Sequence, residues 1–143
     1  MRWQFNDGGR ANAGFNKPSG DCVARAIAIA NNMDYLEVCE KIREFSANER
    51  TGKRKKKCSD PHKGVYKATY KKLLIHLGWN WNPTMKIGSG CKVHLRENEL
   101  PNGTLIVSVS RHLTVVMDGV IHDTHNPDRR GTRCVYGYWT KNN

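Results

Sequence analysis

Cys22, His112 and Asp123 are the residues whose types and positions in the sequence could support covalent catalysis. A thiol becomes a strong nucleophile when a helix N-terminus or a neighbouring imidazolium holds it as a thiolate near neutral pH. Cys22 follows Ser19 and Asp21, either of which can cap a helix, and it opens a nearly all-apolar segment. We therefore expect Cys22 at the start of a buried central helix, where the helix dipole favours the thiolate.

The dipeptide Asp118-Gly119 predicts a tight two-residue turn between two strands rich in β-branched residues. With that turn, Thr114 faces Asp123 across the pair of strands. His112 then faces His125 and is a diagonal neighbour of Asp123 on the same face, roughly 7–8 Å away at the backbone. We predict that His112 is the catalytic base and that Asp123 orients it, as the third residue of a nucleophile triad.

The order of the expected elements, helices first and strands later, argues for an α+β fold in a single domain over residues 1–143. Asp34 and Glu37 resemble a capping box before the second helix. Arg25 is the only charge in the central helix, so it should be paired or lie at the rim. The expected elements are an edge strand at 3–5, helices at about 22–32, 35–46 and 65–77, and strands at 79–83, 104–110, 112–117, 120–124 and 134–139.

Two segments carry a resemblance to a known family. Asp21-Cys22-Val-Ala-Arg25-Ala26-Ile-Ala and Ser110-Arg-His112-Leu-Thr-Val-Val-Met-Asp118-Gly119-Val-Ile-His-Asp123-Thr124 resemble the papain-like fold, in particular the small C39-like peptidase-type proteins often encoded by bacteriophages. The resemblance spans most of residues 20–140. In that family the cysteine begins the central helix, the histidine opens a strand, and an Asp or Asn ends the next strand.

The resemblance implies a papain-like cysteine peptidase, or a related thiol-dependent amidase or acyltransferase, whose central helix packs on a C-terminal antiparallel sheet. It also implies a phage-encoded enzyme that acts on a host or viral protein or peptide and needs no cofactor and no metal. Papain-like enzymes use a Gln shortly before the nucleophile as an oxyanion donor, but Gln4 is the only Gln upstream of Cys22. We expect the Asn16 amide to take this part, together with the backbone N–H of Cys22.

The chain is strongly basic, with 24 Lys and Arg residues against 13 Asp and Glu residues and a net charge of +11. A loop at about 47–64 concentrates this charge in Lys53, Arg54, Lys55, Lys56 and Lys57. Such a run is either a solvated loop or a contact for nucleic acid or an acidic protein. Five irregularly spaced cysteines and no long apolar segment indicate a cytoplasmic protein without disulfides or a membrane span, of unknown oligomeric state.

Two alternatives compete with the enzyme hypothesis. The first is a non-catalytic papain-like binding module that docks a host protein or nucleic acid through the basic loop, with Trp79, Trp81 and Trp139 stacking on bases. The second is a zinc site, because Cys58-x3-His62 and Cys91-x2-His94 have the spacing of metal ligands. Zinc at those four residues is compatible with catalysis at Cys22.

Overall fold

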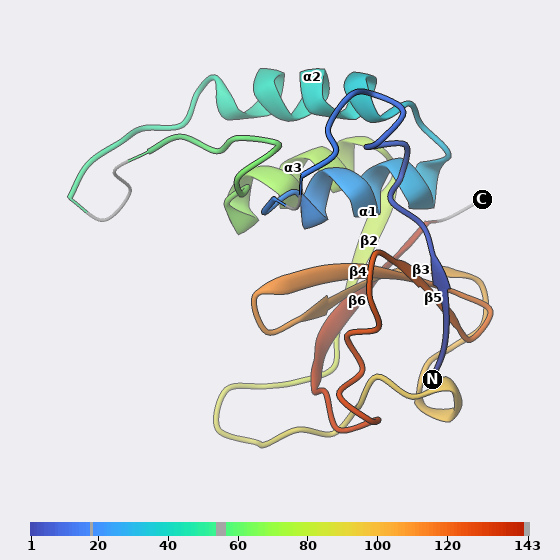
Figure 1. The fold of residues 1–143 in the computed structure, drawn as a ribbon. Helices are drawn as coiled ribbons and strands as arrows, with labels where there is room; N and C mark the ends of the chain where they lie inside the picture. The colour runs from blue at the N-terminus through green and yellow to red at the C-terminus, as the bar shows by residue number, and fades with distance from the viewer. Residues whose placement is uncertain (18, 54–56, 142–143) are drawn as a thin grey trace.

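Three helices form a layer over one face of a six-stranded mixed sheet in the computed structural model of the chain (Figure 1). The structure describes residues 1–17, 19–53 and 57–141. In chain order the elements are β1 (Arg2–Phe5), α1 (Cys22–Asn31), α2 (Tyr35–Ser46), α3 (Lys67–His76), β2 (Trp79–Pro83), a 3-10 turn (Glu97–Glu99), β3 (Thr104–Val109), β4 (His112–Met117), β5 (Val120–Asp123) and β6 (Val135–Lys141). Within these residues, no helix combines the length and the apolar character that crossing a membrane requires.

Helix α1 lies at the centre of the molecule because it is apolar nearly all round. It packs on β3, β4 and β5 with one side and on α2 with the other. Ala24 and Ile27 are fully buried in the core between the layers. The helix ends at Asn31, and the next residue, Asn32, has a left-handed backbone (φ 51°) and directs its N–H back to the last turn. A helix buried on both sides fixes the position of its first residue, Cys22.

The prediction that aspartate side chains cap the first two helices is wrong. Asp21 and Asp34 do occupy the N-cap positions of α1 and α2, but neither side chain makes a capping hydrogen bond. Asp21 is fully buried, and its carboxylate accepts hydrogen bonds from Arg25 and Tyr35 instead. The charge partner thus outcompetes the local backbone N–H groups for the Asp21 carboxylate.

The sheet has the strand order β1-β5-β4-β3-β6-β2. The expected C-terminal antiparallel sheet is therefore incomplete, since β1 joins one edge parallel to β5 and β2 joins the other edge antiparallel to β6. The β4–β5 hairpin has the predicted register, with Met117 opposite Val120. Asp123 consequently ends β5 on the same face as the start of β4.

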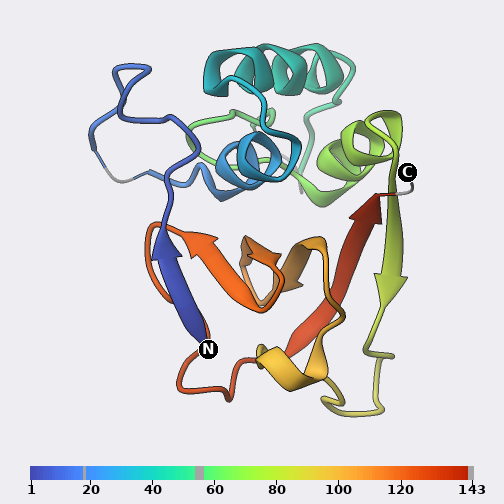
Figure 2. The ribbon, with the colours of Figure 1, turned by 90° about the vertical axis from the view of Figure 1, so that its right-hand side faces the viewer.

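The far face of the sheet is covered by the segment that connects β2 to β3, which Figure 2 shows at the side away from the helices. Leu95 from this segment packs in a second apolar cluster with Leu105, Val107 and Val116. The two faces of the sheet thus bury two cores, as expected for strands without alternating polarity.

A disulfide joins Cys91 in the connecting segment to Cys134 immediately before β6. The expectation of a chain without disulfides is therefore wrong. Cys22, Cys39 and Cys58 are free. The spacing of the cysteines along the chain gave no sign of this bond. The two segments are brought together by the antiparallel bridge between His94 and Cys134, which depends on tertiary structure.

Candidate active site

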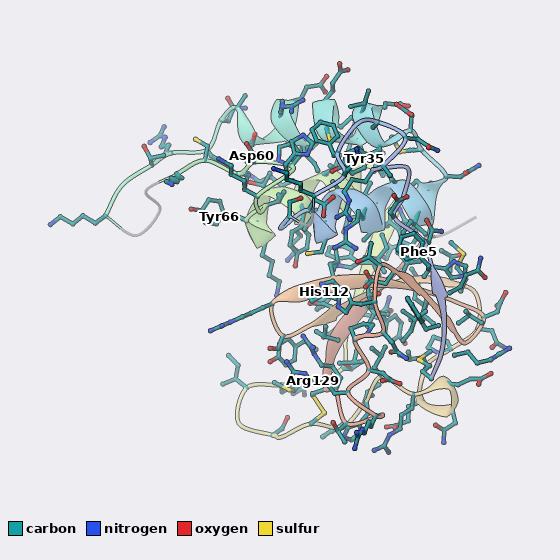
Figure 3. The ribbon with its side chains drawn as sticks, viewed as in Figure 1. Phe5, Tyr35, Asp60, Tyr66, His112 and Arg129 are labelled. Carbon is teal, nitrogen blue, oxygen red and sulfur yellow. A yellow bond between two sulfur atoms is a disulfide. The ribbon has the colours of Figure 1, made fainter. Side chains whose placement is uncertain are left out.

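Helix α1 and the β4–β5 hairpin bring Cys22, His112 and Asp123 together. Cys22 is the first residue of α1, His112 the first of β4 and Asp123 the last of β5. The His112 Nε2 atom lies 2.7 Å from Asp123 Oδ2, and the ring lies close enough to Cys22 to lower the pKa of its thiol. Figure 3 shows His112 at the boundary between the helix layer and the sheet. Because Nε2 faces Asp123, Nδ1 is the nitrogen left to exchange a proton with the thiol.

The three residues stabilise one another's charged forms. Burial alone would raise the pKa of Cys22, but His112, the backbone of Leu113 and the charge of Arg25 together outweigh burial and lower it. Burial likewise opposes the charge of His112, yet Asp123 and Cys22 together raise its pKa to about 9. The same contacts, with help from Thr114 and Arg25, hold the pKa of Asp123 below its usual range despite burial. These shifts favour a thiolate–imidazolium pair near neutral pH.

Arg25 anchors the Asp123 carboxylate from the helix layer. Its guanidinium donates to Asp123 Oδ1 at 2.8 Å and to Asp21 Oδ1 at 2.8 Å, so the predicted pairing of this buried charge is confirmed. On the other oxygen, the Thr114 hydroxyl donates to Asp123 Oδ2 at 2.7 Å. With His112 and with the backbone N–H and hydroxyl of Thr124, five donors hold the two oxygens, so the carboxylate has one orientation.

A cavity of about 550 Å³ opens beside the thiol, between α1, α3 and the turn that joins β3 to β4. Cys22 and His112 both line it. Tyr70 of α3 also lines it, and burial, together with the charge of Cys22, raises the pKa of its phenol against the opposing effect of Ser108. Sequence reasoning missed Tyr70 as a site residue because it falls on the apolar stripe of α3, where an aromatic side chain signals packing alone.

The expected oxyanion donor is not brought to the thiol. Asn16 is exposed and is not among the residues that line the cavity. The first N–H groups of a helix have no acceptor within that helix, and the Asp21 side chain does not cap those of α1. The start of α1 at Cys22 therefore supplies backbone donors for an oxyanion without Asn16.

The four residues with zinc-ligand spacing do not meet. Cys91 is bonded to Cys134, and His94 hydrogen-bonds Glu99 on the far side of the sheet. His62 stacks on Phe15 with ring centroids 4.1 Å apart in the helix layer. The predicted alternative of a site at Cys58, His62, Cys91 and His94 is therefore wrong.

The described residues contain one cluster with three potential metal ligands, namely His112, Asp123 and His125, whose ligand atoms lie within 4.8 Å of one another. Two of these residues are hydrogen-bonded to each other. Asp123 also serves Arg25 and Thr114, so a metal would have to displace those donors. The arrangement of the three residues is better explained by the role of Asp123 in orienting His112 than by metal binding.

The predicted polyanion contact falls partly outside the described residues. Lys53 and Lys57 are exposed, whereas Arg54, Lys55 and Lys56 lie outside the residues that the structure describes. Trp79 and Trp139 are buried in the core, so they are not available to stack on bases. Trp81 packs on Trp139 with ring centroids 5.2 Å apart.

The chain was compared with protein-family models, with curated proteins and with solved structures, and none of the three comparisons found a match. The residues and their geometry are therefore the basis for assigning a function.

Proposed function

We propose that the chain is a papain-like cysteine peptidase, or a related thiol-dependent amidase or acyltransferase, with Cys22 as nucleophile, His112 as base and Asp123 as orienting residue. The observation that carries the proposal is the placement of Cys22 and His112 in the wall of one open cavity, with His112 held by Asp123 at 2.7 Å and lowering the pKa of the Cys22 thiol. By the resemblance to phage-encoded C39-like proteins, the substrate is a host or viral protein or peptide.

The proposed reaction is acyl transfer through a thioester. The Cys22 thiolate attacks the carbonyl carbon, and the carbonyl electron pair moves onto oxygen, where the N–H groups at the start of α1 stabilise it. The tetrahedral intermediate collapses, the C–N bond breaks, and the His112 imidazolium gives its proton to the leaving amine. Water then attacks the thioester, His112 takes its proton, and the thiolate leaves with the acyl group released as an acid.

The disulfide bears on where this chemistry takes place. Disulfides form and persist in oxidising environments and are rare in reducing ones. The Cys91–Cys134 bond therefore argues against the reducing cytoplasm expected from the cysteine count. The free state of Cys22, which the proposed reaction needs, is compatible with either environment.

The pH dependence of alkylation at each free cysteine tests the proposal. Cys22 should react with iodoacetamide at pH values well below the ordinary thiol pKa of about 8.5, because His112 stabilises its thiolate. Exposed Cys58 is the internal reference, and peptide mapping separates the two sites. In His112→Ala, Cys22 should lose its advantage over Cys58.

Equal rates for Cys22 and Cys58 in the unaltered protein would overturn the enzyme proposal. That result would favour the non-catalytic binding module, which keeps the fold but needs no activated thiol.

A further inference from the structure

In the part of the chain that the structure describes, the Lys and Arg residues that line the cavity beside Cys22 face no acidic side chain in its wall. Three cationic residues line it, Lys63 before α3, Lys67 at the start of α3, and Arg111 in the β3–β4 turn. Among the described residues that line it, none is an Asp or a Glu. A cavity walled by one sign of charge concentrates ligands of the opposite sign.

The backbone conformation of the β3–β4 turn fixes the position of Arg111 in the cavity wall. Arg111 lies in the two-residue turn between β3 and β4 with a left-handed conformation (φ 56°), which is uncommon for residues other than glycine. The turn is held from outside, since Arg133 donates a hydrogen bond to the Ser110 carbonyl oxygen. The residue next to Arg111 is His112, and both residues line the cavity.

The two lysines are also held in place. Lys67 lies over the ring of Trp81, with its Nζ atom 5.4 Å from the ring centroid. The backbone of Lys63 packs so closely on Gly20 that a Cβ at position 20 would clash with the Lys63 carbonyl. The backbone of Lys63 is thereby held against Gly20, two residues before the proposed nucleophile.

The acidic residue nearest in sequence to Lys63 already accepts a hydrogen bond within its own loop. Asp60 lines an adjoining cavity of about 480 Å³, which shares Lys63, Gly64 and Val65 with the first. Its carboxylate accepts the backbone N–H of His62 at 2.8 Å, within the loop. Figure 3 shows Asp60 on the helix side of the molecule, apart from His112.

We propose that this cavity selects acidic peptides, with an Asp or Glu side chain close to the carbonyl that Cys22 attacks. The inference rests on the proposed function and names its substrate class. The three cations bind the substrate carboxylate, and the apolar surfaces of Val65, Leu113 and Tyr136 pack on the rest of the peptide.

A pair of alkylating probes that differ in charge tests this preference at the thiol itself. Iodoacetate is anionic and iodoacetamide neutral, and in both cases the Cys22 thiolate displaces iodide to form an S–C bond. The measured quantity is the ratio of the two rate constants at Cys22. His112 contributes equally to this ratio in every variant at a fixed pH, so changes in the ratio report on the other charges.

The test variant is Lys63→Gln/Lys67→Gln/Arg111→Gln. Its matched control, Lys92→Gln/Arg129→Gln/Arg130→Gln, removes three exposed positive charges that do not line the cavity. Arg129 shares the left-handed backbone of Arg111 (φ 50°), and Figure 3 shows it on the other side of the sheet from the helices. The iodoacetate to iodoacetamide ratio should fall about three- to tenfold in the test variant, the size expected for charges a few ångströms apart in water, and little in the control.

The outcomes separate this inference from the proposed function. Fast alkylation of Cys22 by iodoacetamide in all three proteins, with equal falls of the ratio in test and control variants, would overturn the acidic-substrate preference and leave the enzyme proposal intact. Slow alkylation of Cys22 by iodoacetamide in the unaltered protein would overturn the proposed function, and the inference with it. As a second measurement, 0.5 M salt should lower the ratio in the unaltered protein and leave it nearly constant in the test variant.

Discussion

At the residue scale, the carboxylate of Asp123 carries the electrostatics of the site. It accepts hydrogen bonds from both layers, from Arg25 in α1 and from His112 and Thr114 in β4. A negative charge held this firmly beside an imidazole favours the protonated ring. The raised pKa of His112, about 9, follows from this contact and from the neighbouring thiolate, which together outweigh burial.

Asp123→Asn should lower the pKa of His112, because the amide keeps the shape of the carboxylate and removes its charge. A neighbouring opposite charge shifts a pKa by about 1–3 units, so the pH at which His112 loses its proton should move down from about 9 by that amount. An NMR titration of the His112 ring measures the shift directly.

Thr114→Val is the matched control, since it removes one hydrogen bond to Asp123 and keeps the charge. Its shift should be clearly smaller than that of Asp123→Asn. Equal shifts in the two variants would show that hydrogen-bond geometry, rather than charge, sets the pKa of His112.

At the element scale, strand β2 and strand β6 are locked together by an aromatic ring over a glycine. The Trp81 ring packs so closely on Gly137 that a Cβ there would clash with the ring and with the Asn82 carbonyl. The same ring lies under Lys67 at the cavity. This edge of the sheet therefore helps to position one of the cations beside the thiol.

Gly137→Ala should destabilise the protein by about 1–3 kcal/mol, the usual cost of forcing an extra group into a packed site. Urea unfolding measures the change in the free energy of unfolding. Gly52→Ala is the control, because a Cβ at position 52 meets nothing within 4 Å.

A double variant tests whether the Trp81 ring is the cause. In a Trp81→Ala background, Gly137→Ala should lower the free energy of unfolding much less than it does in the unaltered protein, so the effects of the two substitutions are not additive. Independent, additive costs would show that the strain at Gly137 arises from the backbone of β2 alone.

The elements that the sequence predicted well are those with a strong local signal. The second helix was predicted at 35–46 and lies at Tyr35–Ser46, and the Asp118-Gly119 turn set the register that places Thr114 beside Asp123. The parallel pairing of β1 with β5 and the Cys91–Cys134 bond were missed. Both join segments far apart in the chain, and such contacts depend on tertiary packing that no local pattern records.

The candidate site shows the same division. His112 and Asp123 are one hairpin apart, so strand geometry was sufficient to predict their contact. Asn16 was chosen as an oxyanion donor by nearness in sequence, but its side chain is exposed and it does not line the cavity. Arg111 was not predicted because its significance depends on Lys63 and Lys67 arriving from another part of the chain.

At the scale of the whole molecule, the disulfide ties the segment that covers the far face of the sheet to the start of β6. It closes a loop of 43 residues, and its Cys134 end is followed at once by Val135, which pairs with Val109 next to the β3–β4 turn. A covalent link here restrains the unfolded chain and supports the turn that carries Arg111.

The variant Cys91→Ser/Cys134→Ser should lose about 2–4 kcal/mol of stability, as expected for the loss of a native disulfide with a loop of this size. Denaturant unfolding without reductant gives the value. Cys22 should keep its reactivity with iodoacetamide in this variant, because the bond lies outside the triad.

Thiol counting provides the direct check on the bond. The protein denatured without reductant should show three thiols, those of Cys22, Cys39 and Cys58. A count of five would contradict the disulfide and the stability loss predicted from it.

The division of the proposed catalytic pair between the two layers also has a consequence for the order of events during protein synthesis. His112 follows Cys22 by 90 positions, and a ribosome adds about 5–20 residues per second, so the thiol exists for about 5–20 s before the imidazole that activates it has been made. Until β4 and β5 have been synthesised and have packed on α1, Cys22 is an ordinary cysteine. The growing chain therefore lacks the proposed activity while it is being synthesised. The activity begins only when folding brings the two layers together.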